Sequence, residues 1–88
     1  RSINNLGMKQ LTNAFKALNL EFIPSFANFV SFKLEDEKIA MMYYHHLLNN
    51  GVIVRPIANY DLPEFLRVSV GLQRENEIFI KYLSNCNI

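Results

Sequence analysis

The chain has 88 residues, half of them hydrophobic, and a formal net charge of +1. This length fits one small domain, and so low a charge argues against general binding to nucleic acid or to a membrane surface. The lone cysteine, Cys86, excludes a disulfide framework, and no apolar run approaches the roughly 20 residues that span a bilayer. We therefore expect one cytoplasmic domain over residues 1–88. Its helix-like pattern directly after Arg1 indicates a piece of a longer chain.

The first half of the chain predicts a helix and then a strand. Apolar residues recur at helical spacing over residues 2–19, beside the small Gly7: Ile3, Leu6, Leu11, Ala14, Phe15 and Leu18. Residues 21–24 are expected to be extended, because Pro24 restricts the residue before it. In the strand predicted over 28–34, Val30, Phe32 and Leu34 share one face.

The second half predicts two helices that flank two β-rich runs. The helix over 37–49 is capped by Asp36 and ended by Gly51, and its stripe is Ile39, Met42, Tyr43, His46 and Leu47. The runs are 52–54 and 66–70. The last helix covers 73–85, with a stripe of Leu72, Asn76, Phe79, Ile80 and Leu83. This order predicts an α+β fold: a small, mostly antiparallel sheet of three or four strands with helices packed on one face.

The two β-rich runs carry the candidate binding residues. If their valines face the core, alternation places Arg55 and Arg67 on the opposite side of the sheet. Two guanidiniums that converge there would bind a carboxylate or a phosphate. The alternative is that both arginines are solvated, or paired with Asp61 and Glu64. The rest of that face would carry Phe29, Ser31, Lys33, Ile53 and Ser69, a half-apolar surface suited to docking against another domain.

The remaining polar residues give no catalytic or metal site. His45 and His46 are adjacent and point about 100° apart on a helix, so they cannot share a metal. The run 35–37 is a capping cluster, Cys86 has no base partner in sequence, and none of the five lysines lies in an apolar setting. Of the tyrosines, only Tyr60 lies between the two arginines. Residues 25–32 are similar to the aromatic strand of RNA-recognition domains, but Asn28 is one residue too many and the leading basic residue and glycine are absent.

Several segments together resemble the C-terminal domain of histidinol-phosphate aminotransferases. They are Ala-Asn-Phe-Val (27–30), Gly-Val-Ile-Val-Arg-Pro (51–56), Tyr-Asp-Leu-Pro-Glu-Phe-Leu-Arg-Val-Ser-Val-Gly (60–71) and Arg-Glu-Asn-Glu (74–77). That family consists of fold-type I enzymes that use pyridoxal phosphate. The resemblance implies that Arg67 grips the anionic group of the substrate. It also implies that Arg55 helps to hold the phosphate of histidinol phosphate or the distal carboxylate of glutamate.

The resemblance further implies a parent enzyme that moves an amino group between L-histidinol phosphate and 2-oxoglutarate in histidine biosynthesis. The parent would be a homodimer, and its large domain in the same chain would bind pyridoxal phosphate. The cofactor lysine belongs to that domain, so we expect no catalytic, cofactor-binding or metal-binding residue in these 88 residues. Alone, the chain should bind no cofactor and be inactive.

Two residues depart from the pattern of the family. Leu72 stands where members often have a helix-capping threonine, and Asp61 where a glycine is common. These departures leave open an aminotransferase for aromatic amino acids. A non-enzymatic α+β module that binds a small anion or a protein remains the alternative from another class.

Overall fold

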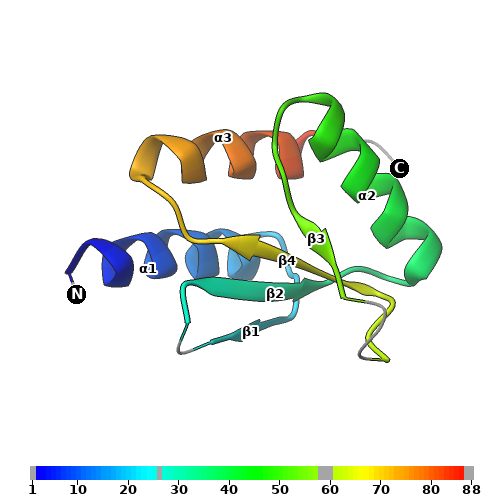
Figure 1. The fold of residues 1–88 in the computed structure, drawn as a ribbon, viewed down its shortest axis with the longest axis horizontal. Helices are drawn as coiled ribbons and strands as arrows, with labels where there is room; N and C mark the ends of the chain where they lie inside the picture. The colour runs from blue at the N-terminus through cyan, green and yellow to red at the C-terminus, as the bar shows by residue number, and fades with distance from the viewer. Residues whose placement is uncertain (1, 26, 58–60, 87–88) are drawn as a thin grey trace.

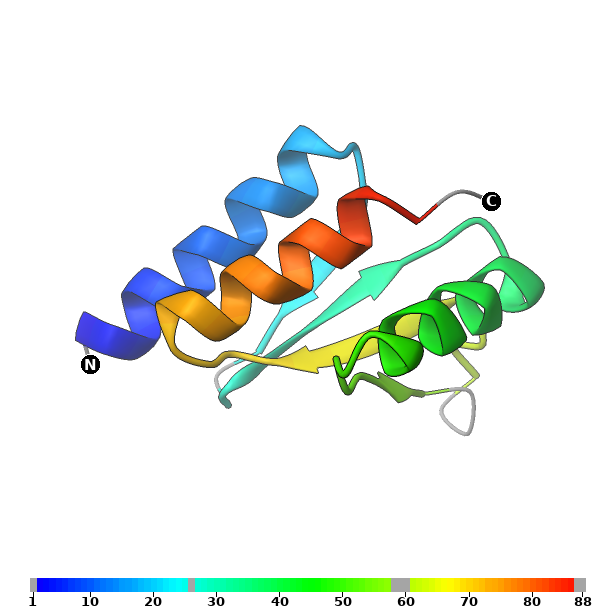
Figure 2. The same ribbon diagram turned by 90° about the horizontal axis from the view of Figure 1, so that it is seen from above.

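A computed structural model describes residues 2–25, 27–57 and 61–86. Within them it has the helices α1 (Ser2–Ala17), α2 (Glu37–Asn49) and α3 (Gln73–Ser84). The strands are β1 (Phe22–Pro24), β2 (Phe29–Lys33), β3 (Arg55–Pro56) and β4 (Phe65–Ser69). The strands form one sheet in the order β1-β2-β4-β3, and each neighbouring pair is antiparallel. All three helices cover the same face of this sheet (Figures 1 and 2), which confirms the predicted α+β fold.

The core lies between the sheet and the helices, and aromatic rings fill its centre. Phe15 of α1 stacks on Phe32 of β2 with ring centroids 5.0 Å apart, and Phe79 of α3 meets Phe32 edge-on at 5.6 Å. Val30, Phe32 and Leu66 are fully buried, and Val68 is 5% exposed. The alternation expected for the two central strands is therefore confirmed, and it directs the intervening residues to the side without helices.

Capping residues set the ends of α2 as predicted. The Asp36 carboxylate accepts the backbone N–H of Ile39 at 2.8 Å, which satisfies one of the free donors of the first turn. Gly51 adopts φ +79° at the other end, and the N–H of Val52 reaches back to the carbonyl of Leu47 at 2.9 Å. Asn19 closes α1 in the same way with φ +58°. Asp61 also has a positive φ, +60°, a conformation that favours the glycine common at this position in the resembled family.

The strand β3 lies further along the chain than the strand predicted over 52–54. The run 52–54 is unpaired, and β3 consists of Arg55 and Pro56. Val52 already uses its N–H in the cap of α2, so the chain must cross from the helix layer to the sheet edge before it pairs. Pro56 has no N–H to extend the ladder, which keeps this edge strand short. At the other edge, the extended segment around Pro24 forms the short strand β1.

Four residues placed on the apolar stripes are exposed instead. They are Leu6 (69%), Leu18 (38%), Met42 (43%) and Leu72 (63%). Each helix buries a narrower band than its apolar residues span: α2 buries Ala40 and Leu47, and α3 buries Asn76, Phe79 and Leu83. Leu6 and Leu72 stand where α1 and α3 begin, beside an open hollow described below.

Candidate functional site

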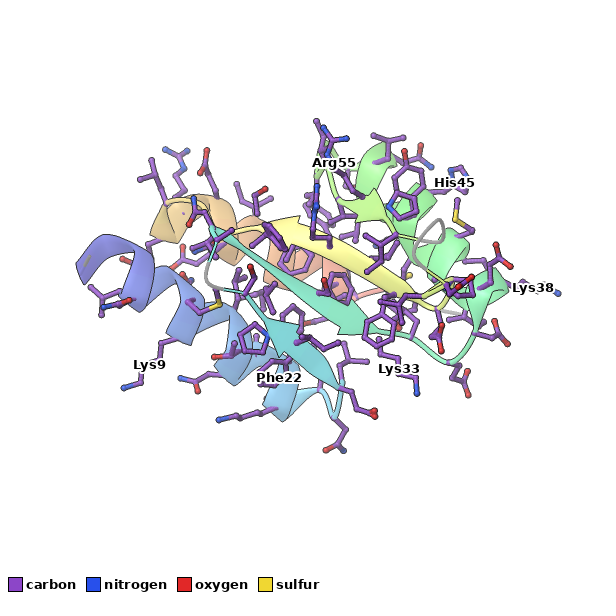
Figure 3. All side chains as sticks on the ribbon, turned by 60° about the horizontal axis from the view of Figure 1, so that its bottom comes forward. Lys9, Phe22, Lys33, Lys38, His45 and Arg55 are labelled. Carbon is purple, nitrogen blue, oxygen red and sulfur yellow. The ribbon has the colours of Figure 1, made fainter. Side chains whose placement is uncertain are left out.

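The two predicted arginines lie next to each other on the open face of the sheet. Arg67 of β4 is the register partner of Arg55 in β3 and of Ser31 in β2, and Ser31 in turn pairs with Ile23 in β1. Directly opposed residues of antiparallel strands project from the same face. These four residues therefore form one row across the sheet, and the arginines occupy adjacent places in it. Figure 3 brings the sheet in front of the helices and labels Arg55 at the β3 edge.

Neither arginine is neutralised by a carboxylate among the described residues. The ion pair found there joins Lys33 to Glu21 at 3.9 Å, and Asp61 and Glu64 make no such contact with Arg55 or Arg67. Arg55 is exposed and Arg67 is half-buried. Both cations therefore stand on the face without helices with no carboxylate partner among the described residues.

Arg67 has one specific neighbour, the aromatic ring of Phe29. The guanidinium carbon of Arg67 lies over this ring, 4.6 Å from the centroid. A cation at this distance is attracted by the negative face of the ring. Alternation along the sequence predicted that Phe29 lies on the open face. Its contact with Arg67 was not predicted, because a diagonal contact between strands can be foreseen only from the register of β2 against β4.

The backbone just after Arg67 is fixed by two asparagines. The side-chain amide of Asn28 donates to the backbone carbonyl of Val70 at 3.3 Å, and the backbone carbonyl of Asn28 accepts the N–H of Val70 at 2.9 Å. Asn76, only 2% exposed, accepts the N–H of Gly71 and donates to the carbonyl of the same residue, both at 3.0 Å. The sequence put Asn76 on a buried stripe without anticipating this function. A buried amide that spans both polar groups of Gly71 locks the corner where β4 turns into α3.

His46 and Cys86 lie in surroundings that do not favour proton transfer or nucleophilic attack. His46 Nε2 donates to the carbonyl of Tyr82 and to the Asn85 side chain, both at 3.0 Å, as expected for a structural histidine. Burial raises the pKa of the Cys86 thiol, which disfavours the thiolate. Burial also raises the pKa of Tyr43, aided by Cys86 and Glu35. Tyr60 lies outside the described residues.

Metal and cofactor sites are likewise not found in ranges 2–25, 27–57 and 61–86. No three His, Cys, Asp or Glu side chains gather there to hold a metal ion. A lysine that binds pyridoxal phosphate works in a desolvated pocket. Lys9, Lys16, Lys38 and Lys81 are exposed and Lys33 is half-exposed, so the residues present do not fit that cofactor.

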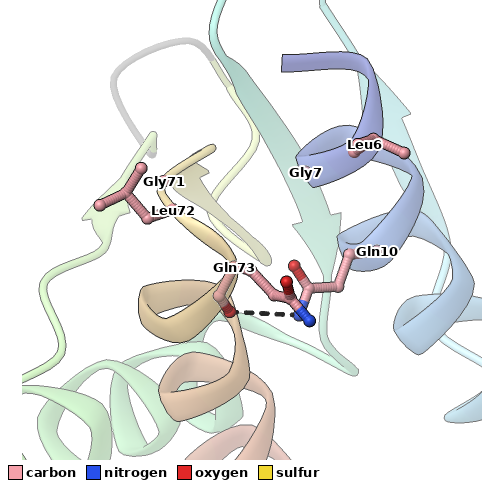
Figure 4. A pocket seen from close by; sticks show the side chains of 6 residues that line it. All are labelled: Leu6, Gly7, Gln10, Gly71, Leu72 and Gln73. Atoms are coloured by element: carbon pink, nitrogen blue, oxygen red, sulfur yellow. Dashed lines mark hydrogen bonds between the residues drawn. The ribbon is translucent and has the colours of Figure 1, made fainter. Parts of the chain in front are cut away.

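One hollow in the described part of the chain lies in the helix layer and is lined by no titratable group. It has a volume of about 480 Å³ and opens between the starts of α1 and α3 (Figure 4). Gln10 donates to the Gln73 carbonyl at 3.3 Å across it. Its lining residues are Leu6, Gly7, Gln10, Gly71, Leu72 and Gln73. This lining is suited to packing rather than to chemistry.

Comparison with known proteins gives one consistent family. The family model for aminotransferase class I and II matches residues 6–83. A histidinol-phosphate aminotransferase of Methylobacillus flagellatus is 49% identical over 82 residues, which are 93% of this chain and 22% of that enzyme. Histidinol-phosphate aminotransferase 2 of Pseudomonas aeruginosa is 48% identical over 83 residues, which are 94% of this chain and 22% of that enzyme. The chain thus spans about a fifth of the length of these relatives.

Solved structures contain the same fold. A structure titled a putative histidinol-phosphate aminotransferase from Erwinia carotovora atroseptica superimposes with a TM-score of 0.76 at 26% identity, over 94% of this chain and 23% of that one. A putative aminotransferase from Burkholderia pseudomallei gives a TM-score of 0.84 over 94% of this chain and 25% of that one. At 19% identity, the second likeness concerns the fold alone. None of the described helices is long and apolar enough to cross a membrane.

Proposed function

This chain belongs to the aminotransferase class I and II family, and from that premise we propose that it is the C-terminal, substrate-clamping domain of a histidinol-phosphate aminotransferase. The parent enzyme would transfer an amino group between L-histidinol phosphate and 2-oxoglutarate in histidine biosynthesis. Two lines of support meet here. Relatives at 41–49% identity carry the name histidinol-phosphate aminotransferase, and the open sheet face presents two adjacent cations to an anionic guest.

The observation that carries the proposal is the register pair Arg55 and Arg67. An arginine offers a planar fork of N–H donors that matches a carboxylate or phosphate, and it stays charged at any working pH. We assign Arg67 to the anionic group of the substrate, with Arg55 assisting. Both would act by positioning the substrate and neutralising its charge, not by transferring protons. No catalytic residue is assigned to this chain.

The cofactor belongs to the remainder of the parent in this proposal. Pyridoxal phosphate supplies the electron sink of such transaminations. Since every lysine of the chain is at least partly exposed, we assign no residue here to that cofactor. The chain alone should neither bind pyridoxal phosphate nor transaminate. A new absorbance band of a lysine-bound cofactor, after incubation of the isolated chain with pyridoxal phosphate, would contradict this.

The partners follow from the same proposal. The chain covers 22% of its relatives, so a large cofactor-binding domain would be supplied by the same polypeptide. The half-apolar face around Arg67 suits contact with such a domain once substrate is bound. We further propose a cytoplasmic, homodimeric parent.

The test uses the full-length parent enzyme with Arg67→Ala. We expect the KM for L-histidinol phosphate to rise by about 10- to 100-fold, because a hydrogen-bonded charge pair in a desolvated site is worth roughly 1.5–3 kcal/mol. Arg74→Ala is the control: Arg74 is an exposed arginine on α3, in the helix layer. Unchanged kinetics of Arg67→Ala would rule out the assigned role.

The same assay separates the substrate classes. Wild-type parent should turn over L-histidinol phosphate far faster than phenylalanine. A preference for phenylalanine would instead assign the chain to an aromatic amino acid aminotransferase.

A further inference from the structure

We propose that Phe29 is a positioning residue for Arg67: its ring holds the guanidinium over the open face of the sheet, in place for the anionic group of the substrate. The inference rests on the proposed function, since it concerns the same arginine. It deepens that function by adding an aromatic side chain that need not touch the substrate.

The contact arises from the register of the central strands. Ser31 is directly opposite Arg67, and Phe29 is directly opposite Ser69. Phe29 is thus the diagonal neighbour of Arg67 on the same face, within reach of long side chains. The Cζ of Arg67 lies 4.6 Å from the ring centroid, so the arginine leans along the sheet towards Ser69 and over the ring.

An aromatic ring holds the cation in a way that suits a binding site. A carboxylate partner would accept hydrogen bonds from the guanidinium and compete with the incoming anion. A ring attracts the charge through its negative face and presents no oxygen acceptor. Within the described residues Arg67 makes no ion pair, so its donors face no rival carboxylate there.

Phe29 also restricts an otherwise flexible and repelled side chain. A free arginine has many rotamers, and ordering it on binding reduces affinity. Arg55, directly opposite on β3, repels Arg67 because like charges face each other across the strands. The ring draws the guanidinium to one side of this pair. Phe29 is itself only half-buried, so filling the core does not explain its place on this face.

The experiment is a double-mutant cycle in the full-length parent enzyme. Phe29→Leu removes the ring and keeps an apolar side chain, whereas Phe29→Tyr keeps the ring. We expect Phe29→Leu to raise the KM for L-histidinol phosphate about three- to tenfold, the range for a partly desolvated cation–π contact, with kcat little changed. Phe29→Tyr should retain the wild-type KM. For L-histidinol, which lacks the phosphate, both variants should have the kcat/KM of the wild-type enzyme.

The cycle with Arg67→Ala separates this inference from the proposed function. If Phe29 acts through Arg67, Phe29→Leu has no further effect on KM in the Arg67→Ala enzyme. An equal loss in both backgrounds, or an equal loss for L-histidinol, overturns the positioning role while the arginine clamp stands. If Arg67→Ala by itself leaves the KM for L-histidinol phosphate unchanged, the proposed clamp is overturned. If Phe29→Leu does not fold, Phe29→Met carries the same test with a more adaptable side chain.

Discussion

Arg55 and Arg67 occupy directly opposed positions on the neighbouring antiparallel strands β3 and β4. Two positive charges so placed repel each other, and such a pair destabilises a sheet by roughly 0.2–1 kcal/mol. No carboxylate among the described residues offsets this repulsion. If the two arginines had only a structural role, replacing one of them with a neutral residue would stabilise the sheet. An anion-binding site, in contrast, needs both positive charges.

The first prediction follows from this repulsion. Arg55→Gln should raise the free energy of unfolding of the chain by roughly a few tenths of a kcal/mol at low ionic strength. The gain should fade towards 1 M salt, where screening acts within about 3 Å. Urea unfolding at both salt concentrations measures it. Lys9→Gln, at an exposed position on α1, is the control and should show no such salt-dependent gain.

The sequence predicted those parts of the fold that depend on local patterns. Alternation in β2 and β4 identified the buried face through Val30 and Val68, and Asp36 and Gly51 marked the ends of α2. The same alternation placed Arg67 on the open face. The segments that carry the two arginines also resemble one aminotransferase family in sequence alone.

The remainder depended on contacts between distant segments. The β-rich pattern that begins at Val52 did not predict where β3 starts, because the N–H of Val52 bonds to the end of α2 instead of to a neighbouring strand. The contact between Phe29 and Arg67 required the register of β2 against β4, which no local pattern encodes. The role of Asn76 at Gly71 depended on the route of the chain after β4.

The second prediction concerns the incomplete cap of α3. Glu75 accepts the N–H of Leu72 at 2.8 Å, but Leu72 has no side-chain acceptor to return the bond. Leu72→Thr should complete this capping box and stabilise the chain by about 1 kcal/mol, because Leu72 is 63% exposed and loses little burial. Thermal unfolding measures the change. Leu72→Ala is the control, and an equal gain in both variants would show that capping is not the cause.

The third prediction concerns the close approach of α1 to the corner after β4. A Cβ at Gly7 would lie 2.6 Å from Val70 Cγ1 and 3.3 Å from the Gly71 carbonyl oxygen. Valine has a stiff side chain, so Gly7→Ala must shift α1 or the corner. We expect a loss of about 1–3 kcal/mol in unfolding free energy, although alanine favours a helix by about 1 kcal/mol. Asn13→Ala, exposed on the same helix, should be neutral or stabilising.

The fourth prediction concerns the reactivity of Cys86. Burial raises the pKa of this thiol in the folded chain, so at a given pH it has less thiolate than in the unfolded chain. The midpoint of the alkylation rate with iodoacetamide against pH should therefore be higher in the folded chain than in urea. By linkage, the folded state gains stability below the ordinary thiol pKa and loses it as pH rises through the raised value.

A matched variant separates burial from charge at the same thiol. The nearby Tyr43 has its own pKa raised by burial and by the charge of Cys86, whereas burial alone raises the pKa of Cys86. Tyr43→Phe removes the hydroxyl and should leave the Cys86 midpoint where it is. A midpoint that falls to the value in urea would show that the tyrosine, not burial, holds the thiol protonated.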